Sequence, residues 1–151
     1  MIAVVQRVKK ASIEINTKLH SSINNGLVVL LGIHTNDTQI EAEYLSKKIV
    51  QLRVFPDKNN KMNISLQDSG ASILVVSQFT LCGDWKKGRR PSFSSSATPE
   101  KAEQLYSHFS KLLKSNNIPV QTGQFAAMMD VELVNDGPVT FVMDSKNNLN
   151  V

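Results

Sequence analysis

Several side chains with hydroxyl or amide groups follow an apolar segment that the sequence predicts to be a β-strand. Ser77, Gln78 and Thr80 come directly after the run "SILVV", with Phe79 among them, and a long polar loop follows. Functional groups are often placed where a strand meets a loop. Gln78 offers a donor and an acceptor, Thr80 a hydroxyl, and Phe79 a flat ring. These residues could line a small polar pocket, but their types alone favour a plain strand end whose hydroxyls satisfy local backbone groups.

The loop that follows is rich in basic residues. The segment "DWKKGRRPSF" begins shortly after Thr80 and carries two aromatic residues, Trp85 and Phe93. Its basic residues are Lys86, Lys87, Arg89 and Arg90. Cations bind phosphates and aromatic rings stack on bases, so this combination suits an RNA strand. A solvated basic loop is the alternative interpretation, and the closeness of Thr80 in the chain favours RNA.

The segment "NDGPVT", residues 135–140, separates two stretches that are both predicted to be strands. Gly137 can adopt backbone angles that other residues avoid, and Pro138 fixes one angle and has no N–H to donate. Such a step could present backbone carbonyl oxygens rigidly to a ligand, and carbonyl oxygens suit an ammonium group. From the residues alone, however, the segment is predicted to be an ordinary turn at the mouth of a hairpin.

Cysteine and histidine offer little chemistry in this chain. Cys82 has no base nearby in the sequence that could form its thiolate, so we interpret it as a small, partly buried residue. His20, His34 and His108 are far apart and lack the spacing of metal ligands. We therefore expect neither a metal site nor a cofactor.

The composition is that of a folded, water-soluble protein. The chain has 151 residues, of which 41% are hydrophobic and 20% charged, and its net charge of +4 permits a polyanionic partner without requiring one. We find no apolar segment long enough to span a bilayer and no secretory signal, and a single cysteine excludes an internal disulfide. We predict one domain over residues 1–151, in the cytoplasm and not in a membrane.

Two amphipathic helices and a group of strands must position these residues. Thr38 and Glu41 form a capping-box pattern before one helix, and Pro99 after Thr98 is typical of the start of another. The strands are predicted at residues 2–8, 11–15, 26–33, 72–79, 128–134 and 139–143. Two main helices with six or seven clustered strands indicate a compact α+β domain with a curved sheet or partly closed barrel.

Taken together, the motifs resemble those of the D-aminoacyl-tRNA deacylase family. The resemblance covers essentially the whole chain, and it is carried by "SQFTL" at 77–81 and "NDGPVT" at 135–140, with "KMN" at 61–63 and "RPSF" at 90–93. It implies a homodimeric enzyme with a compact barrel-like fold. Such an enzyme hydrolyses the ester between a D-amino acid and the 3′-terminal adenosine of tRNA, and also removes glycine mischarged on the alanine tRNA.

The resemblance also implies roles for particular residues. The family's Gly-Pro step is cis, enters the partner's pocket, holds the substrate's α-amino group and excludes L-residues; this role falls on Gly137 and Pro138. Arg7 corresponds to the arginine that braces this step. The catalytic pocket corresponds to Ser77, Gln78, Phe79 and Thr80, and we place Asn135 and Met129 in the substrate-binding set. The RNA-binding set stays the one predicted from residue types: Lys86, Lys87, Arg89 and Arg90. Met128 departs from the family, which usually has an acidic residue at this position.

Two chemical routes remain open. In one, Thr80 attacks the ester and forms an acyl-enzyme; in the other, water attacks with help from the adenosine 2′-hydroxyl, while backbone amides near Phe79 and Thr80 stabilise the oxyanion. The lack of a base near Thr80 in the sequence favours the second route. The alternative functions are a tRNA-binding module without catalysis, a small-ester hydrolase that uses Cys82 or Ser77, and a purely structural interaction domain.

Overall fold

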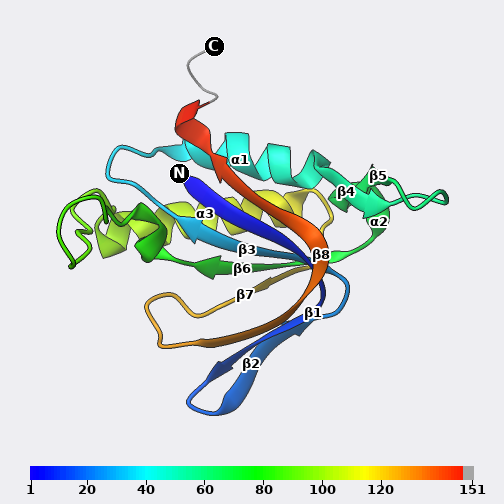
Figure 1. Ribbon diagram of the computed structural model, residues 1–151, viewed down its shortest axis with the longest axis horizontal. Coiled ribbons are helices and arrows are strands. Elements are labelled where there is room, and N and C mark those ends of the chain that lie inside the picture. The colour runs from blue at the N-terminus through cyan, green and yellow to red at the C-terminus, as the bar shows by residue number, and fades with distance from the viewer. Residues whose placement is uncertain (148–151) are drawn as a thin grey trace.

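A computed structural model describes residues 1–147 and shows an α+β fold with a strongly curved sheet (Figure 1). The last four residues of the predicted domain lie outside this range. The strands are β1 (Ile2–Ile15), β2 (Lys18–Ile23), β3 (Gly26–Gly32), β4 (Arg53–Pro56), β5 (Met62–Ser65), β6 (Ser72–Ser77), β7 (Val120–Thr122) and β8 (Asp130–Asp144). The helices are α1 (Gln39–Gln51), the single turn α2 (Leu66–Ser69) and α3 (Pro99–Ser115), with 3-10 turns η1 (Phe79–Cys82) and η2 (Ser145–Asn147).

The main sheet nearly closes into a barrel. Among the described residues its strands follow the order β2-β1-β3-β6-β7, and β8 pairs with the other edge of β1. Helices α1 and α3 lie on one side, while the sheet curls away from them through β1, β2 and β8 (Figure 1). Ser21 Oγ donates a hydrogen bond to the Thr122 carbonyl at 3.0 Å and so connects β2 with β7 across the opening. The predicted α+β fold with a partly closed barrel is confirmed.

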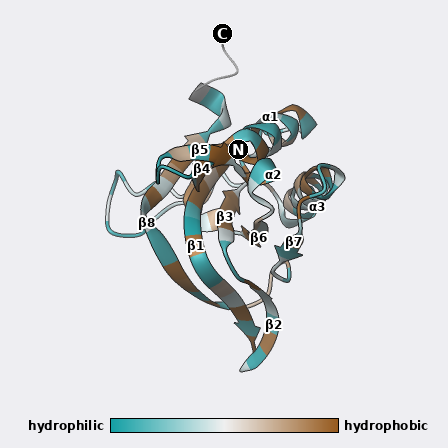
Figure 2. Ribbon diagram, turned by 90° about the vertical axis from the view of Figure 1, so that its right-hand side faces the viewer, coloured by the Kyte–Doolittle hydropathy of each residue, from teal (hydrophilic) through white to brown (hydrophobic). Residues whose placement is uncertain are grey.

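The central strands are buried on both faces. β3 and β6 are parallel neighbours, and Figure 2 shows these hydrophobic strands in the middle of the molecule. One hydrophobic cluster, which includes Leu45 and Phe109, fills the space between the sheet and the helices. A second cluster, which includes Ile13 and Leu74, fills the inside of the curl. Strands covered on both faces have continuous apolar runs, which explains "GLVVLL" and "SILVV".

One long strand replaces the two short strands that were predicted at residues 2–8 and 11–15. The register between β1 and β8 shifts on both sides of Val8, and Lys9 beyond it is exposed. Irregularities of this kind bend a strand. The first half of β1 therefore pairs with β3, while the second half turns away and pairs with β2.

Both predicted helix starts are confirmed. Thr38 caps α1, because its Oγ1 accepts a hydrogen bond from the Ile40 N–H at 3.2 Å while Glu41 Oε2 accepts one from the Thr38 N–H at 2.6 Å. α3 begins at Pro99. Its buried stripe contains Leu105, Phe109 and Leu113, whereas Leu112 is only partly buried. None of the helices in the described part of the chain is long and apolar enough to cross a membrane.

The predicted hairpin at "NDGPVT" is wrong, because β8 is a single strand that runs along β1 over both halves. Asn135 pairs with Val8, and Thr140 pairs with Gln6. The four residues 136–139 therefore lie opposite the single residue Arg7, so they form a bulge and not a turn. The chain keeps its direction through the bulge because β1 supplies backbone partners on both sides of it.

Candidate active site

A cavity of about 560 Å³ opens at the ends of β3 and β6. Its walls come from the end of β6, the start of α3 and the loop between β7 and β8. The lining is mostly apolar and includes Leu31, Val76, Phe125 and Met129 beside the polar Ser77 and Gln78. A mostly apolar concave site with a few polar groups is typical of small-ligand binding.

The predicted catalytic segment lies at this cavity. Ser77 is the last residue of β6 and pairs with Leu31, and the Gln78 N–H donates to the Leu31 carbonyl at 2.9 Å. The turn η1 follows. Ser77, Gln78 and Phe79 line the cavity, whereas Thr80 is exposed and does not line it. The side-chain amide of Gln78 donates to the Thr80 hydroxyl. An amide cannot remove a proton, so this contact does not activate Thr80 as a nucleophile.

The backbone at the start of η1 offers free donors. The first N–H groups of a helical turn have no partner within that turn. In the described part of the chain no acceptor is recorded for the N–H groups of Phe79 and Thr80, and Gln78 makes no side-chain capping bond. These two N–H groups are therefore available to a negatively charged oxygen.

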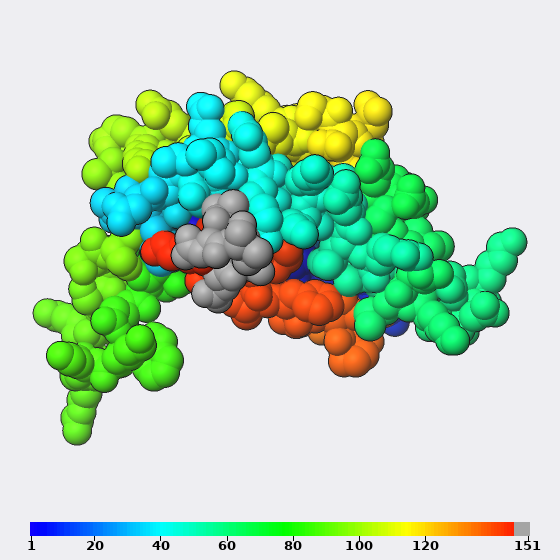
Figure 3. All heavy atoms as spheres, turned by 90° about the horizontal axis from the view of Figure 1, so that it is seen from above, coloured from blue at the N-terminus to red at the C-terminus, as the bar shows by residue number. Residues whose placement is uncertain are grey.

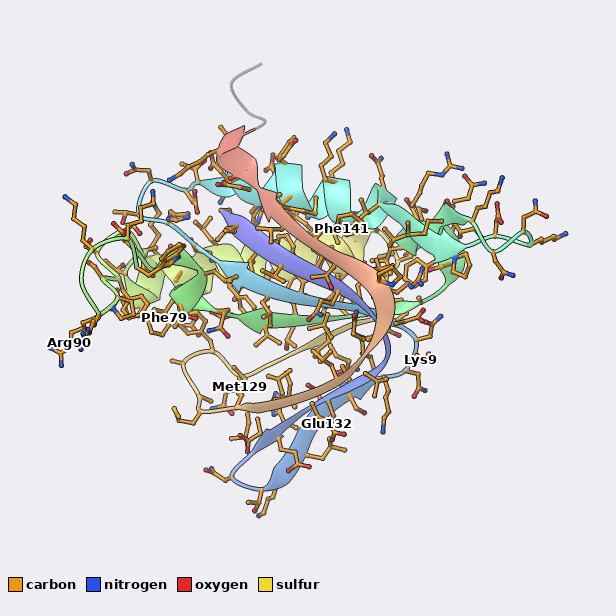
Figure 4. All side chains as sticks on the ribbon, viewed as in Figure 1. Lys9, Phe79, Arg90, Met129, Glu132 and Phe141 are labelled. Atoms are coloured by element: carbon orange, nitrogen blue, oxygen red, sulfur yellow. The ribbon has the colours of Figure 1, made fainter. Side chains whose placement is uncertain are left out.

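An aromatic pair joins the cavity rim to the basic loop. Phe79 is 56% exposed, and its ring lies edge-on to that of Phe93, with centroids 5.0 Å apart. Figure 4 shows Phe79 on the same side of the molecule as Arg90. Gly83 makes room for this pair, because a Cβ at Gly83 would lie 2.9 Å from Cε1 of Phe93. The loop that carries Phe93 is thus fixed next to the cavity.

The basic loop, residues 84–92, is closed at its base and open at its tip. Backbone hydrogen bonds of 2.8 and 2.9 Å connect Asp84 with Ser92, and Gly88 turns the tip with φ +75°. In Figure 3 the loop stands out from the body of the molecule at the lower left. All four predicted RNA-facing residues are exposed on it: Lys86, Lys87, Arg89 and Arg90.

The Gly137-Pro138 step, whose peptide bond is cis, lies far from this cavity within one chain. The bulge is opposite Arg7, which pairs with Leu27, whereas Ser77 pairs with Leu31. This difference in register corresponds to about 13 Å along the strands. In addition, β1 and β3 lie between β8 and β6. The structure therefore does not bring the two main motifs together in a single chain.

Arg7 and Asn135 hold the bulge. Arg7 is buried, its Nε forms an ion pair of 2.8 Å with Asp136 Oδ2, and its guanidinium donates to the Val54 carbonyl. Asn135 Nδ2 donates to the carbonyl of Arg7, opposite the bulge, at 2.9 Å and to that of Val139, within the bulge, at 3.3 Å. Through these contacts Arg7 holds the bulge from β1, and its role in substrate binding stays a prediction. The side-chain amide of Asn135 therefore makes its hydrogen bonds within the chain, and these bonds position the bulge.

The two methionines before β8 differ in their surroundings. Met129 lines the cavity and packs over Gly123, where a Cβ would lie 2.6 Å from its Sδ. Met128 is 90% exposed at the cavity edge. Sequence reasoning missed Gly123 and Phe125 as parts of the site, although both belong to the segment "TGQFAAMM".

Tyr106 supports the cavity wall from α3. Its hydroxyl donates to the Val75 carbonyl at 2.8 Å, and its ring lies 6.0 Å from that of Phe125. Burial raises the pKa of Tyr106 to about 12. The phenol therefore stays neutral near pH 7 and acts as a hydrogen-bond donor beneath the site.

Cys82 is more deeply buried than predicted. It is 3% exposed, and burial raises the pKa of its thiol. Thiolate is the reactive form of cysteine, so little of it is present at neutral pH. This environment does not support the alternative in which Cys82 attacks a small ester.

Known structures share this fold. A solved structure titled "Structural Analysis of a probable eukaryotic D-amino acid tRNA deacylase" matches with a TM-score of 0.82 at 16% identity, over 94% of this chain and 97% of that one. A second, titled "c-Myc DNA Unwinding Element Binding Protein", matches with a TM-score of 0.89 at 41% identity, over 95% and 98%. The molecule thus has the fold of the deacylase class, with a cavity at the end of its parallel strands.

Sequence comparison gives the family. A family model described as D-Tyr-tRNA(Tyr) deacylase matches residues 4–144. A relative from Desulfatibacillum aliphaticivorans, named D-aminoacyl-tRNA deacylase, is 57% identical over 146 residues, which are 97% of this chain and 100% of the relative. The chain belongs to the D-Tyr-tRNA(Tyr) deacylase family, and with it to the hydrolases. The predicted resemblance is confirmed.

Proposed function

We propose that the protein hydrolyses the ester bond of D-aminoacyl-tRNA and releases the free D-amino acid and tRNA, in the cytoplasm and without a cofactor. The observation that carries this proposal is the cavity at Ser77, Gln78 and Phe79, which joins a mostly apolar space to free backbone donors in a chain of the deacylase family. The apolar walls accept varied side chains, and the N–H groups of η1 face the reacting ester.

The working site is formed by two subunits. The Gly137-Pro138 step is exposed and cannot reach the cavity of its own chain, because the register and the two intervening strands separate them. In a homodimer, the bulge of one subunit enters the cavity of the other. β8 supports this arrangement, because its outer edge has no strand partner among the described residues and Val134, Phe141 and Val142 are exposed along it.

The backbone of the bulge selects D-amino acids over L-amino acids. The Gly137 and Pro138 carbonyls accept hydrogen bonds from the α-ammonium group, which all D-amino acids share, and the rigid chain beside them leaves no space for an L-side chain. Arg7 and Asn135 keep this wall in place. Each tenfold of discrimination requires about 1.4 kcal/mol, which steric exclusion of one enantiomer can supply several times over. Glycine has no side chain, so glycine on the alanine tRNA is also a substrate.

Hydrolysis proceeds by attack of water, assisted by the adenosine 2′-hydroxyl. Water adds to the carbonyl carbon, the N–H groups of Phe79 and Thr80 stabilise the oxyanion, and the bond to the ribose oxygen breaks as that oxygen gains a proton. Two observations support this route over attack by Thr80. The Thr80 hydroxyl accepts a hydrogen bond from the Gln78 amide and, among the described residues, donates none to a base. In addition, Thr80 does not line the cavity.

The test is to incubate the purified protein with D-Tyr-tRNA and, separately, with L-Tyr-tRNA. We expect rapid release of D-tyrosine and an L-ester that decays at its spontaneous rate. Tight tRNA binding without turnover of the D-ester would instead identify a non-catalytic tRNA-binding module. Turnover of free amino-acid esters, blocked by a thiol reagent or a serine-directed inhibitor, would instead identify a small-ester hydrolase.

A further inference from the structure

Trp85 is the most exposed aromatic residue in the described part of the chain, with 78% of its surface accessible. A single exposed ring needs no explanation in a folded protein. What distinguishes Trp85 is its position, because it is the first residue of the basic loop after Asp84 and precedes the loop's four cations. A ligand bound at this loop would therefore contact the indole and the cations together.

The backbone around Trp85 is held in place. Asp84 pairs with Ser92 through two backbone hydrogen bonds, and Asp84 Oδ1 accepts a third from the Lys86 N–H at 3.0 Å. The tip of the loop, by contrast, extends beyond this base to Gly88. Trp85 is thus fixed at the base of the loop, while the cations reach outward.

This base is connected to the cavity. Ser92 is followed by Phe93, whose ring packs against Phe79 at the cavity rim. Ser95 Oγ also donates to the Cys82 carbonyl at 2.6 Å, which ties the loop to the end of η1. The order from the cavity outward is therefore Phe79, Phe93, Trp85 and then the basic tip.

We propose that Trp85 stacks on an unpaired nucleobase of the tRNA strand, next to the terminal adenosine that enters the cavity. This inference rests on the proposed function. An RNA strand that leaves the cavity presents unpaired bases beside phosphates, and the loop presents an indole beside four cations. Stacking on a ring tolerates every base, so one tryptophan serves tRNAs that carry different amino acids.

A protein partner is a poorer match for this surface. The loop residues 84–92 carry four cations and a single carboxylate, that of Asp84, which already accepts a hydrogen bond from the loop backbone. Clustered cations around an exposed ring complement a polyanion with π-faces, and single-stranded RNA provides both.

The experiment uses the indole as its own probe, because Trp85 is the only tryptophan of the chain. Tryptophan emission is followed while the protein is titrated with uncharged tRNA that has its unpaired 3′ end, and with the same tRNA lacking its last three nucleotides. Polyphosphate serves as a probe of charge alone. We expect the intact tRNA to quench the emission, and the shortened tRNA and polyphosphate to bind without quenching. Equal emission changes with all three would overturn the proposal.

Variants give an independent readout. Trp85→Ala should raise the Kd for intact tRNA by about 5- to 150-fold, the range expected for loss of one stacked base, and leave the Kd for shortened tRNA unchanged. Trp85→Phe should raise this Kd by a smaller factor, because an aromatic ring remains at the position. Leu19→Ala is the matched control, since Leu19 is 65% exposed on β2. An equal loss of affinity for both tRNAs in Trp85→Ala would contradict stacking.

Turnover assays separate this inference from the proposed function. Hydrolysis of D-Tyr-tRNA without quenching by intact tRNA would refute stacking and leave the deacylase function standing. Quenching by intact tRNA without hydrolysis would support stacking and refute the deacylase function. If intact tRNA quenches the emission and D-Tyr-tRNA is hydrolysed, Trp85→Ala should raise KM for D-Tyr-tRNA and leave kcat unchanged, because the stacked base is remote from the ester.

Discussion

In the proposed mechanism, the residues of the site act mainly through their backbone groups. The Thr80 side chain accepts a hydrogen bond from Gln78, while the N–H groups of Phe79 and Thr80 have no recorded acceptor in the described part of the chain. At the bulge, the side chains of Arg7 and Asn135 hold the chain, and the groups proposed to contact the substrate are the Gly137-Pro138 carbonyls. Backbone groups suit an enzyme that must accept many side chains, because they contact only what all substrates share.

Thr80→Ala tests whether a side chain forms a covalent bond. We expect kcat for D-Tyr-tRNA to fall by less than about tenfold, because water is the nucleophile, whereas loss of a covalent nucleophile costs about 10⁴-fold or more. Single-turnover kinetics with the variant give the rate of the chemical step. Isolation of an acyl-threonine from the wild-type enzyme would contradict the water route.

Gly137→Ala tests the grip of the bulge. A Cβ at Gly137 would meet only Asn135 Oδ1, at the ordinary contact distance of 3.4 Å, so the fold should tolerate it within about 0.5 kcal/mol. Beside the substrate ammonium the added methyl group should clash, and kcat/KM for D-Tyr-tRNA should fall by about tenfold or more. Urea unfolding and steady-state kinetics measure the two effects. Full activity with unchanged chiral preference would exclude the carbonyl grip.

At the scale of elements, β6, η1 and the basic loop form one continuous unit. β6 ends at Ser77, η1 turns the chain at the cavity, and the loop then leaves and returns to place Phe93 on Phe79. The parallel strand β6 thereby positions both the proposed reacting groups and the basic loop that is proposed to contact RNA. The fold orders these groups before the substrate binds, so binding does not have to supply the free energy of ordering them.

Neutralising the basic loop tests this unit. Replacement of Lys86, Lys87, Arg89 and Arg90 by glutamine should weaken tRNA binding and flatten the dependence of log Kd on log salt, by about 0.7 to 0.9 for each lost phosphate contact. A matched control is Lys111→Gln with Lys114→Gln, which removes exposed charges from the second half of α3. A salt slope equal to that of the wild type would remove the loop from the RNA interface.

At the scale of the whole molecule, the curved sheet separates the two parts of the proposed site. The cavity lies where β3 and β6 end, while the bulge lies about 13 Å along the strands and two strands away. Two copies related by a two-fold axis can bring each bulge to the other's cavity, because such an interface is reciprocal. The proposed chemistry then requires a dimer.

Mixed dimers test this arrangement directly. Gly137→Ala breaks the bulge and Gln78→Ala the cavity, so each variant alone should have low activity. When the two are mixed and allowed to exchange subunits, one intact site forms in each heterodimer, and about a quarter of the wild-type activity should return. The measurement is the hydrolysis rate of D-Tyr-tRNA before and after subunit exchange. No recovery with proven heterodimers would place bulge and cavity in the same chain.

Local sequence patterns predicted much of this molecule. The Thr38 capping box and Pro99 start the two main helices, because caps depend only on neighbouring residues. The apolar runs in β3 and β6 predicted buried strands, and the residue types after β6 indicated a polar strand end. The strand predicted at residues 128–134 is the first part of β8, which begins at Asp130.

The sequence by itself determined the helices, the buried strands and the chemical groups on offer, because these depend on local patterns. The tertiary structure decided where those groups lie. In a hairpin the two arms would bond to each other, but here β1 supplies partners to both halves of β8, and "NDGPVT" becomes a bulge. A strand finds its partner from distant parts of the chain, so no local pattern reveals that the bulge and the cavity lie on different parts of the sheet.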